Sequence, residues 1–252
     1  YDKLLNAADE IQTQLGELNG VSYQESMKDL LSAINEVSKT PDDNTARAAL
    51  VQSAVSFLDR SQAVYKGLVS YQSNLNTEIY NITNRINEIG EQIMSLNKQI
   101  AQIESGVETA MTLRDERDLL LDELSGYAKI DYTEDSRGIV SVMLEGQFFC
   151  DNMSVSHLGL STVEGTDFYI PVWKEMKNEP LYNMEITMST ANNTDIGSLK
   201  GLLAARGTIS PTYANMTAPA QTVTQMPDRA DYGSDEDYNN AVAAYTAYRD
   251  YK

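Results

Sequence analysis

Few residues of this chain have the types and spacing that chemistry needs. His157 is the only histidine, so a catalytic triad or a Cys-His pair would have to include it, and no nucleophile motif accompanies it. Cys150 is the only cysteine, which excludes an internal disulfide and a site with several cysteine ligands. We interpret His157 as a structural histidine and Cys150 as a small buried hydrophobic residue.

The 37 acidic residues offer no recognisable site either. Paired carboxylates of the glycosidase type remain open, because spacing along the chain does not give spacing in space, but solvated helix faces account for nearly all of these residues. Aligning Gly233 with the glycine of a calcium loop puts Ala230 and Tyr232 where oxygen ligands belong. No phosphate-binding loop or dinucleotide fingerprint occurs. We expect no catalytic residue, no cofactor and no metal.

The charge of the chain restricts its partners. A formal net charge of -18 repels phosphate backbones, which argues against nucleic acid and against anionic membrane surfaces. No apolar run approaches the roughly 20 residues that span a bilayer, and the first residues do not form a secretion signal. We expect a soluble chain without nucleic-acid or membrane partners.

The elements that would position any site are dominated by one heptad seam. Its apolar residues follow one another at alternating spacings of four and three, a pattern typical of a helix that buries one face against another helix. The seam consists of Leu75, Ile79, Ile82, Ile86, Ile89, Ile93, Leu96, Ile100 and Ile103, and its spacing continues to Val107.

Helix signals define the frame around the seam. Ser22 and Glu25 form a capping box that predicts a second helix after residues 4–18. Thr40 followed by Pro41 predicts the start of a helix over residues 41–104, about 90 Å long at 1.5 Å per residue. Charge is sparse on the flanks of the seam, which favours antiparallel helices of the same chain as partners. One flank holds Glu78, Arg85, Gln92 and Gln99, and the other holds Asn76, Thr83, Gly90 and Asn97. We expect residues 1–38 and 110–126 to cover the seam.

The segment after the seam predicts a return helix. Leu113, Leu120 and Leu124 share one stripe, while Arg114 and Asp118, four residues apart, are expected on the outer face.

From residue 129 the period changes to the alternation of strands, with turns at residues 135–138 and 145–146. The predicted fold is α+β, an elongated antiparallel helical bundle or coiled-coil rod with a small β-rich domain inserted. The predicted domains are a helical rod (1–128 and 192–207), a β-rich outer domain (129–191), and a flexible connection with an acidic helical tail (208–252). The tail places Tyr238, Val242, Tyr245 and Tyr248 at helical spacing, either as an interface or as an acidic solvated helix.

Several segments, in this order along the chain, resemble the family of flagellar hook-associated protein 1. They are TPDDNTARAALVQSA, LNKQIAQIESG, LRDERDLLLDELS, GIVSVMLEGQFF and GSLKGLLAARG. The resemblance spans residues 1–207. Residues 107–109 depart from the small apolar pair that is usual in the family, and residues 208–252 match nothing.

The resemblance implies a structural, non-catalytic subunit of the bacterial flagellum that joins the hook to the filament. It implies copies of itself, hook protein and the neighbouring hook-associated protein on the filament side as partners. It also implies terminal helices that pair in the assembled tube and bind an export chaperone, and export by the flagellar type III apparatus to an extracellular location. On this view the chain is a fragment that lacks those terminal helices.

Two other functions stay open. An extracellular adhesin or tail-fibre-like module could use the same coiled-coil stalk to hold out a binding domain. An enzyme carried by the β-rich domain, with Glu145 or His157 in its site, has no motif in its support.

Overall fold

The computed structural model describes residues 2–15, 22–106, 109–183 and 196–208, together with residues 229, 234, 238, 239, 241 and 242. The chain divides into two compact units, Tyr1–Thr208 and Ile209–Lys252. Of the predicted tail stripe, Tyr245 and Tyr248 lie outside the described residues. The domain boundaries expected from the sequence stay predictions.

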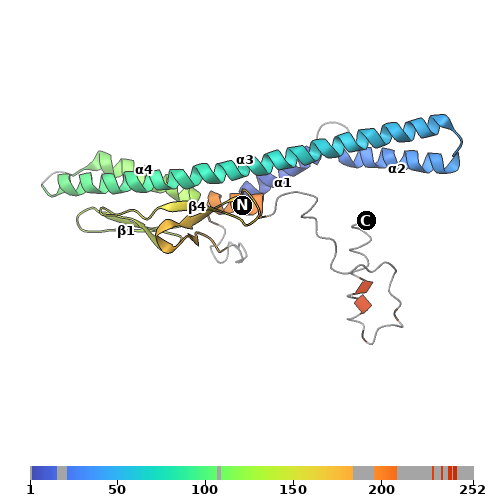
Figure 1. Cartoon of the computed structure of the whole chain (residues 1–252). Coiled ribbons are helices and arrows are strands. Elements are labelled where there is room, and N and C mark those ends of the chain that lie inside the picture. Colours follow the sequence, from blue (N-terminus) through green and yellow to red (C-terminus); the bar gives the residue numbers. More distant parts are fainter. Residues whose placement is uncertain are drawn as a thin grey trace. The chain divides into compact units, whose positions relative to one another are not determined.

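Five helices are described in the first unit: α1 (Asp2–Leu15), α2 (Tyr23–Lys39), α3 (Asn44–Glu104), α4 (Met111–Tyr127) and α5 (Ser198–Arg206). The 61 residues of α3 span about 90 Å. Helix α2 folds back along the N-terminal half of α3, and α4 returns along its C-terminal end (Figure 1). The predicted α+β class with a long helical rod is confirmed.

The start of α2 is as predicted, because the Ser22 hydroxyl accepts a hydrogen bond from the Glu25 N–H at 3.0 Å. The predicted start of α3 is wrong. Its N-cap is Asp43, whose carboxylate accepts from the Thr45 N–H at 2.8 Å. Thr40 instead ends α2 and begins a turn that the Asp43 N–H closes on the Thr40 carbonyl at 3.1 Å. Pro41 occupies the second position of this turn, which proline favours as much as a first helical position.

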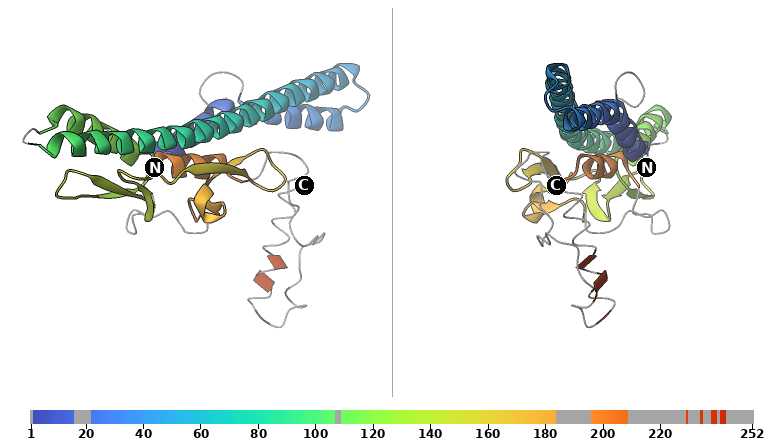
Figure 2. Two further views of the ribbon diagram at one scale, coloured as in Figure 1. Left: turned by 60° about the vertical axis from the view of Figure 1, so that its left-hand side comes forward. Right: turned by 90° about the vertical axis from the view of Figure 1, so that its right-hand side faces the viewer.

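The strands form two antiparallel sheets of three. One has the order β1 (Ile130–Glu134), β2 (Val140–Leu144), β3 (Gln147–Cys150), and the other β4 (Leu158–Thr162), β5 (Tyr169–Trp173), β6 (Glu179–Pro180), with a 3-10 turn, η1 (Lys174–Met176), between the last two. Glu145 and Gly146 both have positive φ, 50° and 81°, as the two-residue turn between β2 and β3 requires. Figures 1 and 2 show both sheets on one side of α3.

One cluster of buried residues joins α3, α4, α5 and both sheets. From Leu75 to Ile100 the seam residues are at most 8% exposed. Ile103 is the exception at 38% exposed, because α3 ends one residue later and its last turn projects past its cover. Val107 lies outside the described residues.

The expected cover of the seam is wrong in part, since strands and α5 pack on it together with α4, whereas α2 packs on the N-terminal half of α3. Gly90 shows how a strand can replace a helix there. A Cβ at this position would lie 2.7 Å from the Phe149 ring and 2.8 Å from Val155. The absence of a side chain at Gly90 therefore lets β3 approach the backbone of α3.

We predict that Ile93→Asp disrupts the first unit, because Ile93 is fully buried. An unpaired buried carboxylate costs several kcal/mol, and the whole free energy of unfolding of a domain is only roughly 5–15 kcal/mol. The matched control is Ile103→Asp, a seam position that is exposed, which should change the free energy of unfolding by about 0.5 kcal/mol or less. Thermal melting followed by circular dichroism measures both. Equal melting of the two variants would contradict burial of the seam.

Candidate functional site

An apolar face is exposed on the hairpin of α2 and α3. Its residues are 36–63% exposed although all are large and apolar. On α3 they repeat at heptad spacing, with Gln62 in the one polar position of the row. We call this the hairpin face, and it consists of Met27, Leu31 and Ile34 on α2 and Val51, Val55, Leu58, Tyr65 and Val69 on α3.

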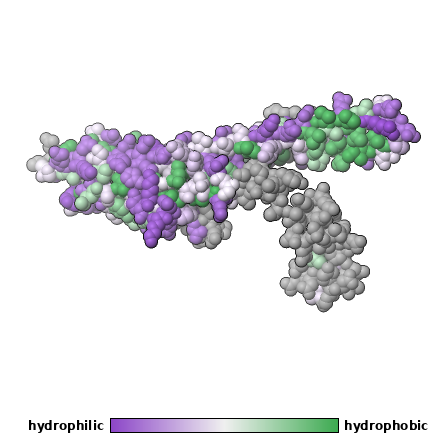
Figure 3. All heavy atoms as spheres, viewed as in Figure 1, coloured by the Kyte–Doolittle hydropathy of each residue, from purple (hydrophilic) through white to green (hydrophobic). Residues whose placement is uncertain are grey.

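The two stripes of the hairpin face lie on the same side of the helix pair. Each residue of the hairpin face comes directly after a more buried residue on the face where α2 and α3 contact each other. Met27, for example, follows Ser26, and Tyr65 follows Val64. One residue turns a helix by about 100°, and in an antiparallel pair equal rotations about the two axes bring both stripes to one side. Figure 3 shows apolar residues gathered over this end of α3.

The opposite side of the same hairpin is polar. A cleft of about 250 Å³ lies there, lined by Ser26, Asp29, Gln52, Ser53 and Ser56. One side of the hairpin is therefore suited to water and the other to a further helix, because an apolar heptad stripe is buried best by another helix.

Asparagines attach the sheets to α3. The side-chain amide of Asn97 donates to the Val140 carbonyl at 2.8 Å and accepts from its N–H at 3.1 Å. Asn87 makes the same pair of bonds with Leu158, at 2.9 and 2.8 Å. Asn76 donates to the Asp167 carbonyl and accepts from the Tyr169 N–H, at 3.0 and 2.8 Å. Each amide thus pairs with backbone groups as a neighbouring strand would.

The neutral flank of the seam is expected to contact helices, and this is incomplete for Asn76 and Asn97, which bind backbone of the sheets as well as one arginine each from a helix, Arg206 of α5 and Arg117 of α4. An amide satisfies a donor and an acceptor at once, which suits the backbone at a sheet edge at least as well as a neighbouring helix.

Two arginines of the return helix join α4 to the first sheet. Arg117 is 1% exposed and donates to the Asn97 side chain at 3.1 Å and to the Gly138 carbonyl at 2.6 Å. Arg114 forms two hydrogen bonds with Glu104, at 2.7 and 2.6 Å, and an ion pair with Glu134. The bonds from Arg114 lower the pKa of Glu104 to about 2, with help from the Ala110 N–H.

The other residues of the predicted return helix fall as follows. Leu120 and Leu124 are buried and Leu113 is partly buried. Asp118 lies on the surface, but the expectation that Arg114 shares that outer face is wrong. Its guanidinium turns toward Glu104 because two carboxylates, one at the end of α3 and one in β1, stabilise it there.

The residues that could carry chemistry are held in structural contacts. The ring of His157 lies 2.9 Å from Glu91 through Nε2, and its backbone N–H donates to Glu175. Cys150 is fully buried, and burial raises the pKa of its thiol to about 12. Within the described residues no group of three or more His, Cys, Asp or Glu side chains could hold a metal ion. No helix among them is long and apolar enough to cross a membrane.

We predict that Asn97→Leu destabilises the first unit by about 3 kcal/mol, because it leaves the N–H and carbonyl of Val140 buried without partners. Asn81→Leu, at an exposed position of α3, is the matched control and should have little effect. Urea unfolding measures both free energies. An unchanged free energy of unfolding in Asn97→Leu would show that the hydrogen bonds of this amide do not hold the sheet.

The ion pair at Glu104 predicts a pH dependence. Because the pKa of Glu104 is lower in the folded chain than in the unfolded chain, its stabilising effect is complete above about pH 4.5 and disappears as the pH falls toward 2. Glu104→Gln should therefore lower stability at pH 6 and lose this difference from the wild type near pH 2. Glu116→Gln, an exposed carboxylate of α4, is the control. Denaturant unfolding at several pH values measures the free energy of unfolding of each variant and of the wild type. If Glu104→Gln differed from the wild type as much at pH 2 as at pH 6, the prediction would be refuted.

Comparisons with known proteins agree with this architecture. The chain is 27% identical over 165 residues to flagellar hook-associated protein 1 of Bacillus subtilis (strain 168), a match that covers 65% of this chain and 32% of that protein. The solved structure of the flagellar hook junction protein FlgK from Burkholderia pseudomallei superposes with a TM-score of 0.61 at 21% identity, over 81% of this chain and 38% of that one. The chain thus spans about a third of the length of these relatives, and the structural likeness shows a shared fold.

A family profile decides the relationship. The profile described as "Flagellar hook-associated protein FlgK helical domain" matches residues 8–230, which is most of the chain. The resemblance seen in the sequence is thereby confirmed. The profile extends it past residue 207, so the expectation that residues 208–252 match nothing is wrong for residues 208–230. The chain belongs to the family of the FlgK helical domain of flagellar hook-associated proteins.

Proposed function

We propose that this chain is the helical part of a structural subunit that joins the flagellar hook to the filament. Membership in the FlgK helical-domain family carries the proposal. The proposed partners are copies of the subunit, hook protein and the neighbouring hook-associated protein on the filament side. Export through the flagellar type III apparatus with a chaperone, and an extracellular place in the flagellum, are proposed with it.

The geometry supports a mechanical role for α3. Its C-terminal half is held by α4, α5, both sheets and the paired bonds of Asn87 and Asn97. Its N-terminal half carries α2 and, at Arg60 and Gly67, the end of α1, and it leaves the hairpin face exposed. An apolar face rimmed by polar residues on a protein surface marks a contact with another protein segment.

We assign this contact to the terminal helices that the family resemblance implies. The heptad spacing of Val51, Val55, Leu58 and Tyr65 fits a helix as the occupant, since knobs of an added helix would fall into the holes between them. The seam on the opposite half of α3 is closed by the chain itself, so the hairpin face is the part of α3 that depends on segments outside residues 2–208.

Neither the family nor the two similar proteins favours an adhesin. The family consists of structural flagellar proteins, and we assign no reaction to the chain.

The test uses the whole protein in a motile strain whose own gene is deleted. Val55→Glu with Leu58→Glu places two carboxylates on the hairpin face, and burying them costs several kcal/mol, so attached filaments should fall at least about tenfold. Gln52→Glu with Ser56→Glu adds the same charge on the polar side of α3 and should leave motility intact. Swimming in soft agar and filament counts by electron microscopy measure the effect.

Two further measurements make the result decisive. Both double variants of the present chain should melt within about 2 °C of the wild type, because all four positions are exposed. Normal filaments on cells that carry the face variant would show that the hairpin face is not an assembly contact. Normal motility in the deletion strain itself would instead disprove the junction function.

A further inference from the structure

The hairpin face lies on two rows of α3 that are covered farther along the helix. Equivalent positions of successive heptads are seven residues apart, so Tyr65 lies in the same row as the buried seam residue Ile79, and Val69 lies in the same row as Asn76. From Asn76 onward, elements of the chain itself cover both rows. The hairpin face is therefore the exposed continuation of a contact surface that the chain uses elsewhere.

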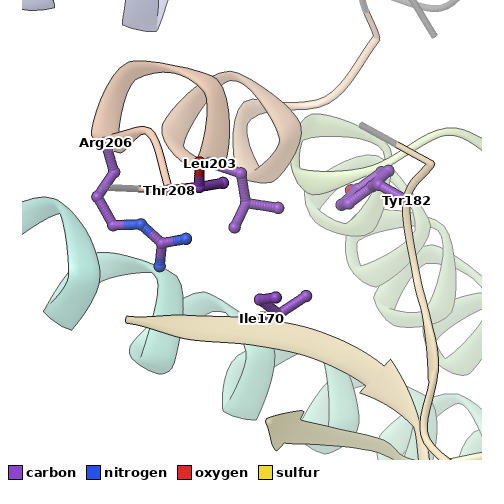
Figure 4. Close-up of a pocket in the computed structure, with 5 residues that line it drawn as sticks. All are labelled: Ile170, Tyr182, Leu203, Arg206 and Thr208. Atoms are coloured by element: carbon purple, nitrogen blue, oxygen red, sulfur yellow. The ribbon is translucent and has the colours of Figure 1, made fainter. Parts of the chain in front are cut away.

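The cover of these rows begins at the end of α5. Arg206 of α5 donates to the side-chain oxygen of Asn76 at 2.7 Å, and its guanidinium lies 5.0 Å from the centre of the Phe168 ring. Figure 4 shows this end of α5 above β5, with Arg206 and Ile170 beside a small cavity of about 40 Å³. The hairpin face thus ends against α5 and β5, and a partner that ran straight on along α3 would meet them.

The hairpin face has the area of a stable interface. Its eight side chains are about half exposed, and each has roughly 200 Å² of surface, so the face offers roughly 800 Å². Each partner of a standard protein interface contributes about that area. Because both stripes are turned by about 100° from the contact between α2 and α3, they point out of the plane of the helix pair. A second helical hairpin covers two such stripes more fully than one helix does.

The charge of the hairpin permits a second copy of the chain as the partner. Residues 22–70 contain five basic and six acidic side chains, whereas the rest of the chain contains 14 basic and 31 acidic ones, out of 19 and 37 in all. The negative charge that keeps copies of this chain apart therefore lies elsewhere, and two hairpins can meet without strong repulsion.

We propose that two copies of this chain pair through the hairpin face, with their α3 helices antiparallel about a two-fold axis at Gln62. Gln62 is exposed and occupies the one polar position in its stretch of the row. At the axis its amide meets the same amide of the second copy, and the two can exchange a hydrogen bond because each has a donor and an acceptor. A polar residue at this position then sets the register of the pair.

The apolar residues match in this register. An antiparallel pair centred on residue 62 places Val55 opposite Val69 of the second copy, since the two are equally far from the centre. Leu58 comes opposite Tyr65 in the same way. The two-fold axis repeats both contacts in the other direction, so every apolar residue of the row from 55 to 69 faces an apolar partner.

A parallel pair is disfavoured by charge and by shape. Asp59 and Lys66 are exposed and directly follow residues of the hairpin face. The antiparallel pair brings Asp59 of each copy beside Lys66 of the other, whereas a parallel pair would bring like charges together. Because the row of Val69 runs under β5 at Asn76, parallel copies would also bring their sheets into the same space.

The second copy competes with the terminal helices for the hairpin face. A docked terminal helix leaves no room for the second copy, so the dimer is a state of subunits that have not yet been assembled. This competition rests on the proposed assignment of the terminal helices, whereas the dimer itself depends only on the hairpin face.

Sedimentation equilibrium of the present chain over a wide range of concentrations tests the pairing. The mass should rise with concentration from that of one chain, 28.0 kDa, toward twice that value. Val55→Glu with Leu58→Glu should weaken the pairing at least about 100-fold, because the interface would bury carboxylates from both copies. Gln52→Glu with Ser56→Glu, on the polar side of the hairpin, adds the same charge and should leave the pairing intact.

The substitution Gln62→Cys tests the position of the axis. Cys150 is fully buried, so a thiol at position 62 is the one available for oxidation. Gln62→Cys should form a disulfide between the copies, which requires Cα atoms within about 7 Å of each other. Val51→Cys, also exposed, is the control. In the antiparallel pair the two copies of position 51 lie about 33 Å apart and should not be joined.

Exchange of the rim charges tests the direction of the helices. Asp59→Lys should weaken the dimer about tenfold, and Lys66→Asp added to it should restore the pairing, because the two charges are then exchanged. A chain that stays monomeric, a face variant that dimerises as well as its control, or equal disulfide yields at positions 51 and 62 would overturn the proposal. None of these outcomes bears on the junction function, which the motility of the deletion strain tests.

Discussion

The seam of α3 has to be removed from water, and the rest of the first unit is arranged to achieve this. Five of its isoleucines are completely buried: Ile79, Ile86, Ile89, Ile93 and Ile100. Each contributes about 2 kcal/mol on burial, far more than any exposed ion pair of the unit. Helix α4, helix α5 and both sheets share the task of covering it. After α3, the helix α4, the two sheets and the helix α5 follow in turn along the chain, and each of them packs on the seam.

The polar contacts set the register of this cover. Apolar contacts alone would allow strands to slide along α3, because hydrophobic burial is not directional. Asn76, Asn87 and Asn97 fix one backbone position each in β5, β4 and β2, and Arg117 ties the last of these to the return helix. The amides thus specify which residue of a strand lies at which turn of the helix.

How much of this the sequence reveals depends on the kind of interaction. The seam, the end of α3 at Glu104 and the helical return at residues 113–124 follow from spacing, because apolar periodicity reports directly on a buried face. The spacing does not predict which elements pack on that face, because an asparagine beside the seam can form hydrogen bonds with a helix or with a strand equally well. The spacing of Arg114 from Asp118 indicates the outer face of the helix, whereas the partners of Arg114, Glu104 and Glu134, come from other elements of the chain. The α3 part of the hairpin face is hard to recognise from spacing alone, because Gln62 interrupts its apolar row.

The continuity of α3 has one more consequence. No proline interrupts its 61 residues, so a sharp kink within it would require breaking backbone hydrogen bonds. The half that carries the exposed stripe and the half that carries the sheets are therefore the two arms of one stiff lever. A tilt imposed at the hairpin is therefore transmitted to the sheets, without a joint in between to absorb it.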